Sequence, residues 1–224
     1  MIMKLSVVLP CRNEEKTIKI CITKIKKALK GMDYEIIVSD SSSDRSTEIA
    51  DKLKVKIVNA KKGYGNSYLE GFKHAKGNYI VMGDADDTYD FLEIPRFIGE
   101  LDKGYDLVIG SRLKGNIKKG AMKPLHRYIG NPILTLIFNS LFNTRFTDTH
   151  SGFRAIKRNS LEKLNLKSTG MEFALEMLIK SAKKKLKIKQ IPISYSRRIG
   201  ESKLNSFKDG LRHLNLMFKE KLKN

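Results

Sequence analysis

The chain has 224 residues, of which 41% are hydrophobic, and lysine and arginine outnumber aspartate and glutamate by 44 to 24. This composition predicts one globular domain with a sizeable core. The net charge of +20 indicates a polyanionic partner: nucleic acid, anionic lipid or a phosphorylated substrate. Cys11 and Cys21 match neither a zinc site nor a disulfide framework. The most apolar long stretch, residues 132–142, falls short of the ~20 residues that a membrane-spanning helix needs.

Apolar runs and helical periodicities alternate over the first half of the chain. Buried strands are predicted at residues 5–9, 35–38, 55–58, 79–82 and 106–110. Helices are predicted between them at residues 14–30, 45–53, 64–76 and 91–101. This alternation is typical of βαβ units. We therefore expect an α/β fold with a mostly parallel central sheet flanked by helices.

Polar, turn-forming segments follow four of these strands, at residues 10–15, 39–44, 61–65 and 83–87. Parallel α/β sheets bind ligands beyond the carboxyl ends of their strands, so these segments are expected to form one pocket. The last segment places Asp84 and Asp86 directly after an apolar strand. Such a pair holds Mg²⁺ or Mn²⁺ well only when a substrate diphosphate completes the coordination. A surface turn rich in aspartate is the alternative.

Other nucleotide-binding and nucleic-acid-binding folds fit the sequence poorly. It contains no Gly-x-x-x-x-Gly-Lys-Ser/Thr loop, and no Gly-x-Gly-x-x-Gly follows the first predicted strand. The basic charge leaves a nucleic-acid-binding protein as an alternative. However, the chain lacks an RNP-type motif and a zinc-finger spacing, and it has no tryptophan. We therefore expect no nucleic-acid partner.

Five segments resemble, in order, motifs of glycosyltransferase family 2, which has the GT-A nucleotide-sugar fold. They are residues 8–15, 37–44, 84–88, 148–154 and 198–204. The last two are similar to the Ser/Cys-Gly-Phe-Arg and Arg-x-Gly-x-Ser-Lys-Leu motifs of the dolichyl-phosphate mannose and glucose synthases. The segment at residues 37–44 departs from its family motif, because Ser39 and Ser41 stand where the family has an acid and a glycine. The resemblance covers residues 5–211.

This resemblance implies the roles of individual residues. A UDP- or GDP-hexose is expected to contact Pro10, Arg12, Asn13, Glu14, Asp40, Gly63, Asp84, Ala85 and Asp86. The expected metal ligands for Mg²⁺ or Mn²⁺ are Asp84 and Asp86, and the expected catalytic residues are Asp86, Asp148 and Arg198. The acceptor phosphate is expected to contact Arg112, Arg127, Ser151, Arg198 and Lys203, since arginine binds phosphate bidentately.

Several of these assignments have structural alternatives. Each of the four cations Arg112, Arg127, Arg198 and Lys203 could be a solvated surface residue. Asp40 could cap the helix that begins near Arg45. Asp148 could pair with Arg154, and Gly63 could serve a turn rather than a ligand.

The second half of the chain carries features that suit a membrane surface. Residues 111–130 contain six lysine or arginine residues and no acid, and we expect them to form a basic loop that leads into the apolar segment 132–142. From Ser206 onward, apolar residues recur at helical spacing among cations. A basic segment beside a short apolar helix is typical of proteins that rest on anionic lipid. A core helix preceded by a mobile loop is the alternative.

We therefore expect one glycosyltransferase domain, residues 1–224, with a nucleotide-sugar-binding half at residues 1–110 and an acceptor- and membrane-facing half at residues 111–224. The expected function is inverting transfer of a hexose from a nucleotide sugar to a polyprenyl (dolichyl) phosphate. We expect a cytoplasmic enzyme attached peripherally to the inner face of the cell membrane. A saccharide or other non-prenyl acceptor is the alternative within the same enzyme class.

Overall fold

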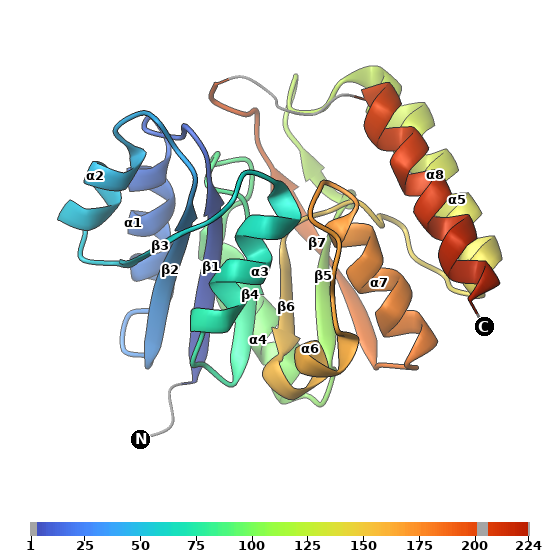
Figure 1. Ribbon diagram of the computed structural model, residues 1–224, viewed down its shortest axis with the longest axis horizontal. Helices are drawn as coiled ribbons and strands as arrows, with labels where there is room; N and C mark the ends of the chain where they lie inside the picture. The colour runs from blue at the N-terminus through green and yellow to red at the C-terminus, as the bar shows by residue number, and fades with distance from the viewer. Residues whose placement is uncertain (1–3, 201–205, 224) are drawn as a thin grey trace.

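The computed structural model describes residues 4–200 and 206–223, and a seven-stranded sheet runs through its centre (Figure 1). The strands lie in the order β3-β2-β1-β4-β6-β5-β7. Their bounds are β1 Leu5–Cys11, β2 Tyr34–Asp40, β3 Lys56–Asn59, β4 Tyr79–Met82, β5 Leu107–Ile117, β6 Arg154–Lys157 and β7 Ile188–Tyr195. Only β6 runs antiparallel to its neighbours, β4 and β5. The predicted mostly parallel sheet is confirmed.

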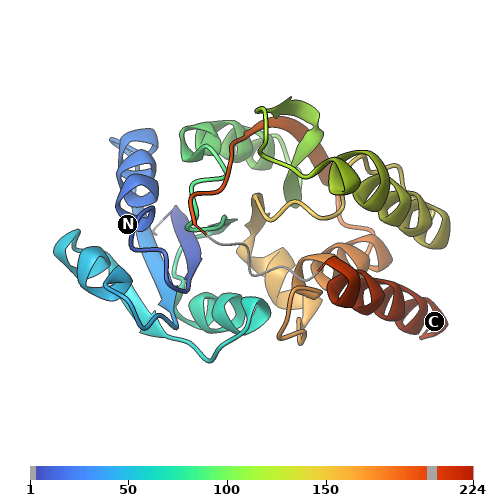
Figure 2. The ribbon, with the colours of Figure 1, turned by 90° about the horizontal axis from the view of Figure 1, so that it is seen from above.

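Helices cover both faces of the sheet (Figures 1 and 2). One face carries α1, α2 and α4, and the other carries α3, α5, α6, α7 and α8. Their bounds are α1 Ile18–Ala28, α2 Ser46–Lys52, α3 Tyr64–His74, α4 Ile94–Asp102, α5 Asn131–Phe142, α6 Arg158–Leu164, α7 Phe173–Lys183 and α8 Ser206–Leu222. None of the helices within the described residues is long and apolar enough to cross a membrane.

Strand β1 shows why its sequence is apolar at consecutive positions. Val7 and Leu9 pack in the core on the α1 side, whereas Val8 packs in the core on the α3 side, and all three are 0% exposed. A strand buried on both faces needs a continuous apolar run rather than an alternating one. This arrangement places the carboxyl ends of β1, β2 and β4 at one edge of the sheet.

The basic segment 111–130 is only partly a loop, contrary to the prediction. Strand β5 continues to Ile117 because it pairs with β7, which lies far away in the sequence. At Gly115 a Cβ would lie 1.9 Å from the carbonyl oxygen of Ile193, so the close approach of the two strands requires glycine. A π-helical turn, η2 (His126–Gly130), then leads into α5.

Candidate active site

Strands β1 and β2 bring the first two polar segments together. Cys11 at the end of β1 lies opposite Asp40 at the end of β2. Asn13 has a φ of 56°, and its Oδ1 accepts a hydrogen bond from the backbone N–H of Ser43 at 2.8 Å. Its own N–H donates to the Ser42 hydroxyl at 2.8 Å. Two predicted nucleotide-binding residues, Asn13 and Asp40, thus lie on loops that hydrogen bonds fix to each other.

Asp40 does not cap α2, so that alternative is wrong. Its Oδ1 accepts hydrogen bonds from the N–H and hydroxyl of Ser42 at 3.3 and 2.6 Å, and its Oδ2 accepts one from the Thr47 hydroxyl. Asp44 binds the start of the helix instead, because its Oδ1 accepts a hydrogen bond from the Ser46 N–H at 2.9 Å. Asp40 therefore braces the loop that follows β2, and its contact with a nucleotide stays a prediction.

Strand β4 delivers Asp84 and Asp86 to the same edge. The Oδ1 of Asp86 accepts hydrogen bonds from the N–H and hydroxyl of Thr88 at 3.1 and 2.7 Å. Between the two aspartates, Ala85 turns its carbonyl toward the Thr17 hydroxyl at 2.7 Å. The Oδ1 of Asp84 is buried and has no hydrogen-bond partner within residues 4–200 and 206–223. Burial and then the charge of Asp86 raise the pKa of Asp84 to about 7, so this corner favours a cation.

The two carboxylates fit a divalent ion of the Mg²⁺ or Mn²⁺ type. Both ions prefer oxygen ligands, and the unpaired Oδ1 of Asp84 is a buried acceptor that an ion would satisfy. Among the described residues, no group of three His, Cys, Asp or Glu side chains could hold a metal. Two protein carboxylates suit an ion whose other positions are taken by water and a substrate diphosphate.

Arg198, which follows β7, reaches into this acidic edge. Its Nη1 donates to Oδ2 of Asp86, and its Nη2 donates to Oε1 of Glu14. Burial alone would lower the pKa of Arg198, but Asp86 and Glu14 raise it overall. The structure thus brings together the predicted catalytic residues Asp86 and Arg198 with the predicted nucleotide-binding residue Glu14.

The loop that precedes β6 lies against Asp84. The N–H of Gly152 donates to the Tyr89 hydroxyl at 2.8 Å. A Cβ at Gly152 would lie 2.6 Å from the Tyr64 hydroxyl and 3.3 Å from Oδ2 of Asp84, so a larger residue here would displace the Tyr64 side chain. The sequence analysis missed Tyr64 and Tyr89 as site residues. The only signal for them was their position, directly after Gly63 and three residues after Asp86.

Arg154 fixes the loop that precedes β6 through hydrogen bonds to backbone carbonyls. It is fully buried and donates to three backbone carbonyls, those of Thr149 at 3.1 Å, Ser151 at 2.8 Å and Ala174. The alternative pairing of Asp148 with Arg154 is therefore wrong.

Asp148 pairs with Arg112 instead. The Nε of Arg112 donates to Oδ2 at 2.7 Å, and its Nη2 donates to Oδ1 at 2.9 Å. Burial alone would raise the pKa of Asp148, but Arg112 lowers it overall. A buried carboxylate with a low pKa and a bidentate partner is a weak base. The predicted catalytic role of Asp148 and the predicted phosphate contact of Arg112 stay predictions, and the geometry gives both residues a supporting role in the loop.

The other predicted acceptor residues lie on separate elements. Ser151 is 0% exposed, and its Oγ has no hydrogen-bond partner in the described part of the chain. It lies next to Gly152 and therefore close to Asp84. Arg127 lies in η2, with its guanidinium 5.3 Å from the centroid of the Tyr128 ring. Lys203 lies outside the described residues. Of the remaining donor residues, Pro10 is half-buried in β1 and Arg12 is exposed just beyond it.

Gly63 and Gly65 at the start of α3 have a packing role. Gly63 has a φ of 133°, and a Cβ there would lie 2.6 Å from the carbonyl oxygen of Thr169. A Cβ at Gly65 would lie 2.1 Å from the carbonyl oxygen of Ser168. The loop at residues 168–169 packs directly on the start of the helix, which gives a structural reason for glycine at position 63. The contact of Gly63 with a nucleotide stays a prediction.

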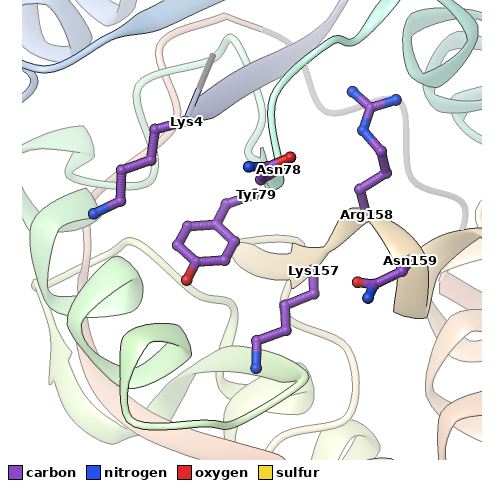
Figure 3. Close-up of a pocket in the computed structure, with 6 residues that line it drawn as sticks. All are labelled: Lys4, Asn78, Tyr79, Lys157, Arg158 and Asn159. Atoms are coloured by element: carbon purple, nitrogen blue, oxygen red, sulfur yellow. The ribbon is translucent and has the colours of Figure 1, made fainter. Parts of the chain in front are cut away.

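A hollow of about 670 Å³ lies at the opposite edge of the sheet (Figure 3). Its lining residues are Lys4, Asn78, Tyr79, Lys157, Arg158 and Asn159. Lys4 precedes β1, Asn78 and Tyr79 precede and begin β4, and Lys157, Arg158 and Asn159 end β6 and begin α6. The hollow therefore lies at the amino ends of the parallel strands β1 and β4. It is separate from the carboxyl-end loops that carry Asp84 and Asp86.

Comparison with known proteins agrees with the motifs. A family model described as "Glycosyl transferase family 2" matches residues 6–165. The chain is 46% identical over 217 residues to the low-salt glycan biosynthesis hexosyltransferase Agl6 of Haloferax volcanii, covering 95% of this chain and 52% of that protein. It is 31% identical to the dolichol-phosphate mannosyltransferase of Pyrococcus furiosus, with 97% and 64% covered. It is 33% identical to a dolichyl-phosphate hexose transferase of Haloferax volcanii, with 92% and 89% covered. The chain thus spans about half the length of the first relative and under two thirds of the second.

Solved structures show the same fold. Glucosyl-3-phosphoglycerate synthase from Mycobacterium tuberculosis, in complex with UDP, superposes with a TM-score of 0.77 at 20% identity, covering 98% of this chain and 80% of that one. The same enzyme with Mn²⁺, UDP and phosphoglyceric acid gives 0.77 at 22% identity, with 98% and 78% covered. At these identities the likeness concerns the fold alone. The expected GT-A fold is confirmed.

Proposed function

Because this chain belongs to glycosyl transferase family 2, we propose that it transfers a hexose from a UDP- or GDP-linked donor to a polyprenyl phosphate. Relatives named dolichol-phosphate mannosyltransferase and dolichyl-phosphate hexose transferase support this acceptor class. The paired carboxylates at the end of β4 support the use of a divalent ion.

We assign different roles to the residues at the carboxyl ends of the strands. Asp84 and Asp86 would hold a divalent ion, which would supply positive charge to neutralise the diphosphate leaving group. The loops of Asn13 and Asp40 hold the nucleoside. A phosphate oxygen of the acceptor attacks the anomeric carbon as the bond to the diphosphate breaks, so an α-linked donor gives a β-linked product. The buried ion pair of Asp148 with Arg112 leaves this carboxylate unsuited to a double displacement.

A phosphate acceptor also suits this site because Asp148, the candidate general base, is paired with Arg112. A lipid phosphate is ionised at neutral pH, so it needs cations that hold it in line rather than a group that removes its proton. Arginine is well suited to this task, and Arg198 lies beside the metal-binding pair.

The main observation in support of a lipid acceptor is an exposed apolar surface on η2, α5 and α8. Within the described residues, eight of the eleven exposed large hydrophobic side chains lie on or next to these elements. They are Leu125, Tyr128, Ile129, Ile133, Leu136, Leu211, Phe218 and Leu222. An exposed cluster of this kind marks an interaction surface. We call it the η2/α5/α8 surface.

Each of the two helices has a buried inner face and an exposed outer face, so each packs on the core and also presents apolar side chains at the surface. Phe138 of α5 and Met217 of α8 are 0% exposed in the core, whereas Leu136 is 68% and Phe218 is 52% exposed. Lys219 and Lys221 follow on α8. Apolar side chains flanked by cations suit anionic lipid. We therefore propose peripheral attachment to the inner face of the cell membrane through this surface.

A transfer assay with matched acceptors tests the function. The protein is supplied with UDP-glucose, UDP-N-acetylglucosamine or GDP-mannose and Mn²⁺, and with a polyprenyl phosphate, the corresponding polyprenol or a saccharide. We expect product only with the phosphorylated prenol, and NMR of its anomeric proton should show inversion. Product on a saccharide with none on polyprenyl phosphate would assign the alternative acceptor class.

A further inference from the structure

Arg198 donates a hydrogen bond to Oδ2 of Asp86, the oxygen that we expect a divalent ion to bind. The Oδ1 of Asp86 accepts two hydrogen bonds from Thr88, so Oδ2 is the oxygen directed to other partners. That oxygen accepts the hydrogen bond from Nη1 of Arg198. A divalent ion that binds Asp86 through Oδ2 therefore has to replace the guanidinium there.

The contact is strong enough to affect metal binding. The Arg198 side chain is 24% exposed, and those of Asp86 and Glu14 are 7% and 9% exposed. Charged pairs in such partly buried positions are less screened than surface pairs. Glu14 holds the second nitrogen of the same guanidinium. This second contact keeps Arg198 at the pocket edge when its contact with Asp86 is lost.

We propose that Arg198 and the divalent ion exchange at Asp86, so that metal binding releases Arg198 to hold the phosphate of the acceptor. This inference rests on the proposed function, since it takes the metal and the phosphate acceptor from there. Before metal binds, Arg198 neutralises Asp86 and Glu14. Once an ion takes Oδ2 of Asp86, Nη1 of Arg198 no longer donates to that oxygen, while Nη2 still donates to Glu14.

The exchange couples the two ligands in both directions. An ion that removes Arg198 from Asp86 favours binding of an anionic acceptor, because the guanidinium then no longer neutralises Asp86 and its positive charge acts on the acceptor. By thermodynamic linkage, a phosphate that engages Arg198 must raise the affinity for the ion by the same factor. A fixed structural salt bridge between Arg198 and Asp86 predicts no such coupling.

Mn²⁺ binding in the presence of UDP or GDP, which supplies the diphosphate oxygens but no sugar to transfer, tests the exchange. The Mn²⁺ bound by the nucleotide alone is subtracted. Free Mn²⁺ is measured by electron paramagnetic resonance during titration of the wild type, Arg198→Ala and Arg197→Ala. Arg197 is the adjacent exposed arginine, so its variant matches the change in net charge. Each titration is repeated with farnesyl phosphate, and with farnesol as the uncharged control, after correction for Mn²⁺ bound by the probe alone.

We expect Arg198→Ala to bind Mn²⁺ about five-fold more tightly than the wild type, as loss of one partly exposed competing ion pair implies. Arg197→Ala should bind Mn²⁺ like the wild type. Farnesyl phosphate should tighten Mn²⁺ binding several-fold in the wild type and in Arg197→Ala, but much less in Arg198→Ala.

Two results overturn the exchange and leave the proposed function standing. One is Mn²⁺ binding by Arg198→Ala that equals or falls below that of the wild type. The other is an equal response to farnesyl phosphate in the wild type and Arg198→Ala. If neither protein binds Mn²⁺, the metal-dependent function is itself refuted and the exchange with it.

Discussion

Replacing Asp148 by asparagine should destabilise the protein by about 3–5 kcal/mol, the cost of leaving one member of a buried ion pair without its partner. The carboxylate of Asp148 accepts three hydrogen bonds from Arg112: from Nε at 2.7 Å, from Nη2 at 2.9 Å and from the backbone N–H at 3.1 Å. The two side chains are 0% and 9% exposed, so water cannot replace the lost charge. Domains are stable by only about 5–15 kcal/mol, so the loss is a large fraction of the total.

Urea unfolding followed by circular dichroism measures this change. The denaturant dependence increases with protein size, so a value of about 3 kcal/mol per molar urea suits this chain, and the midpoint of Asp148→Asn should fall by about 1–2 M. Glu48→Gln is the control, because it breaks an exposed pair with Lys52 and should change the stability by less than about 1 kcal/mol. The double variant Arg112→Met/Asp148→Leu should regain most of the stability, since apolar residues of similar size often replace a buried pair at little cost.

Activity separates the supporting role of Asp148 from a catalytic one. If Asp148→Asn unfolds at the wild-type midpoint and yet loses turnover, the ion pair is not structural and the residue acts in the chemistry. That result would refute the assignment made from the geometry.

Three further predictions address the metal pair, the acid sensitivity and the membrane surface. Asp86→Asn should retain the wild-type melting temperature but lose Mn²⁺ binding and nearly all transfer; normal turnover in a folded variant would remove Asp86 from the metal site. Burial, followed by a neighbouring imidazole, lowers the pKa of His150 from 6.5 to about 3, so the folded state favours the neutral ring. Its stability contribution is present above pH 6.5 and is lost as the pH falls toward 3, reaching a loss of at most about 2 kcal/mol at pH 5. Melting temperatures between pH 7.5 and 5 should therefore fall less in His150→Asn than in the wild type, and parallel curves would contradict the reasoning. Leu136→Glu combined with Phe218→Glu should weaken sedimentation with anionic vesicles at least ten-fold while leaving Mn²⁺ affinity unchanged; unchanged sedimentation would exclude the η2/α5/α8 surface as the lipid contact.

The first half of the fold, and the edge of the sheet that carries Asp40, Asp84 and Asp86, could be predicted from the sequence alone. Parallel strands buried on both faces need continuous apolar runs, and helices between them need apolar residues at helical spacing. Both are local patterns, and β1, β2 and β4 follow them. Since parallel strands end at one edge, Asp40, Asp84 and Asp86 could be placed together before any contact was known.

Which charged side chains pair with one another was decided only by the tertiary structure. Asp148 pairs with Arg112 rather than the nearby Arg154, and Arg198 reaches Asp86 across 112 positions of sequence. The insertion of the antiparallel β6 between β4 and β5 brings Gly152 onto Asp84, and the pairing of β5 with β7 extends a strand into the predicted loop. Periodicity and motifs report the environment along a short stretch of chain. They carry no information on which of 44 cations meets which of 24 acids, because that depends on distances set by the packing of the whole sheet.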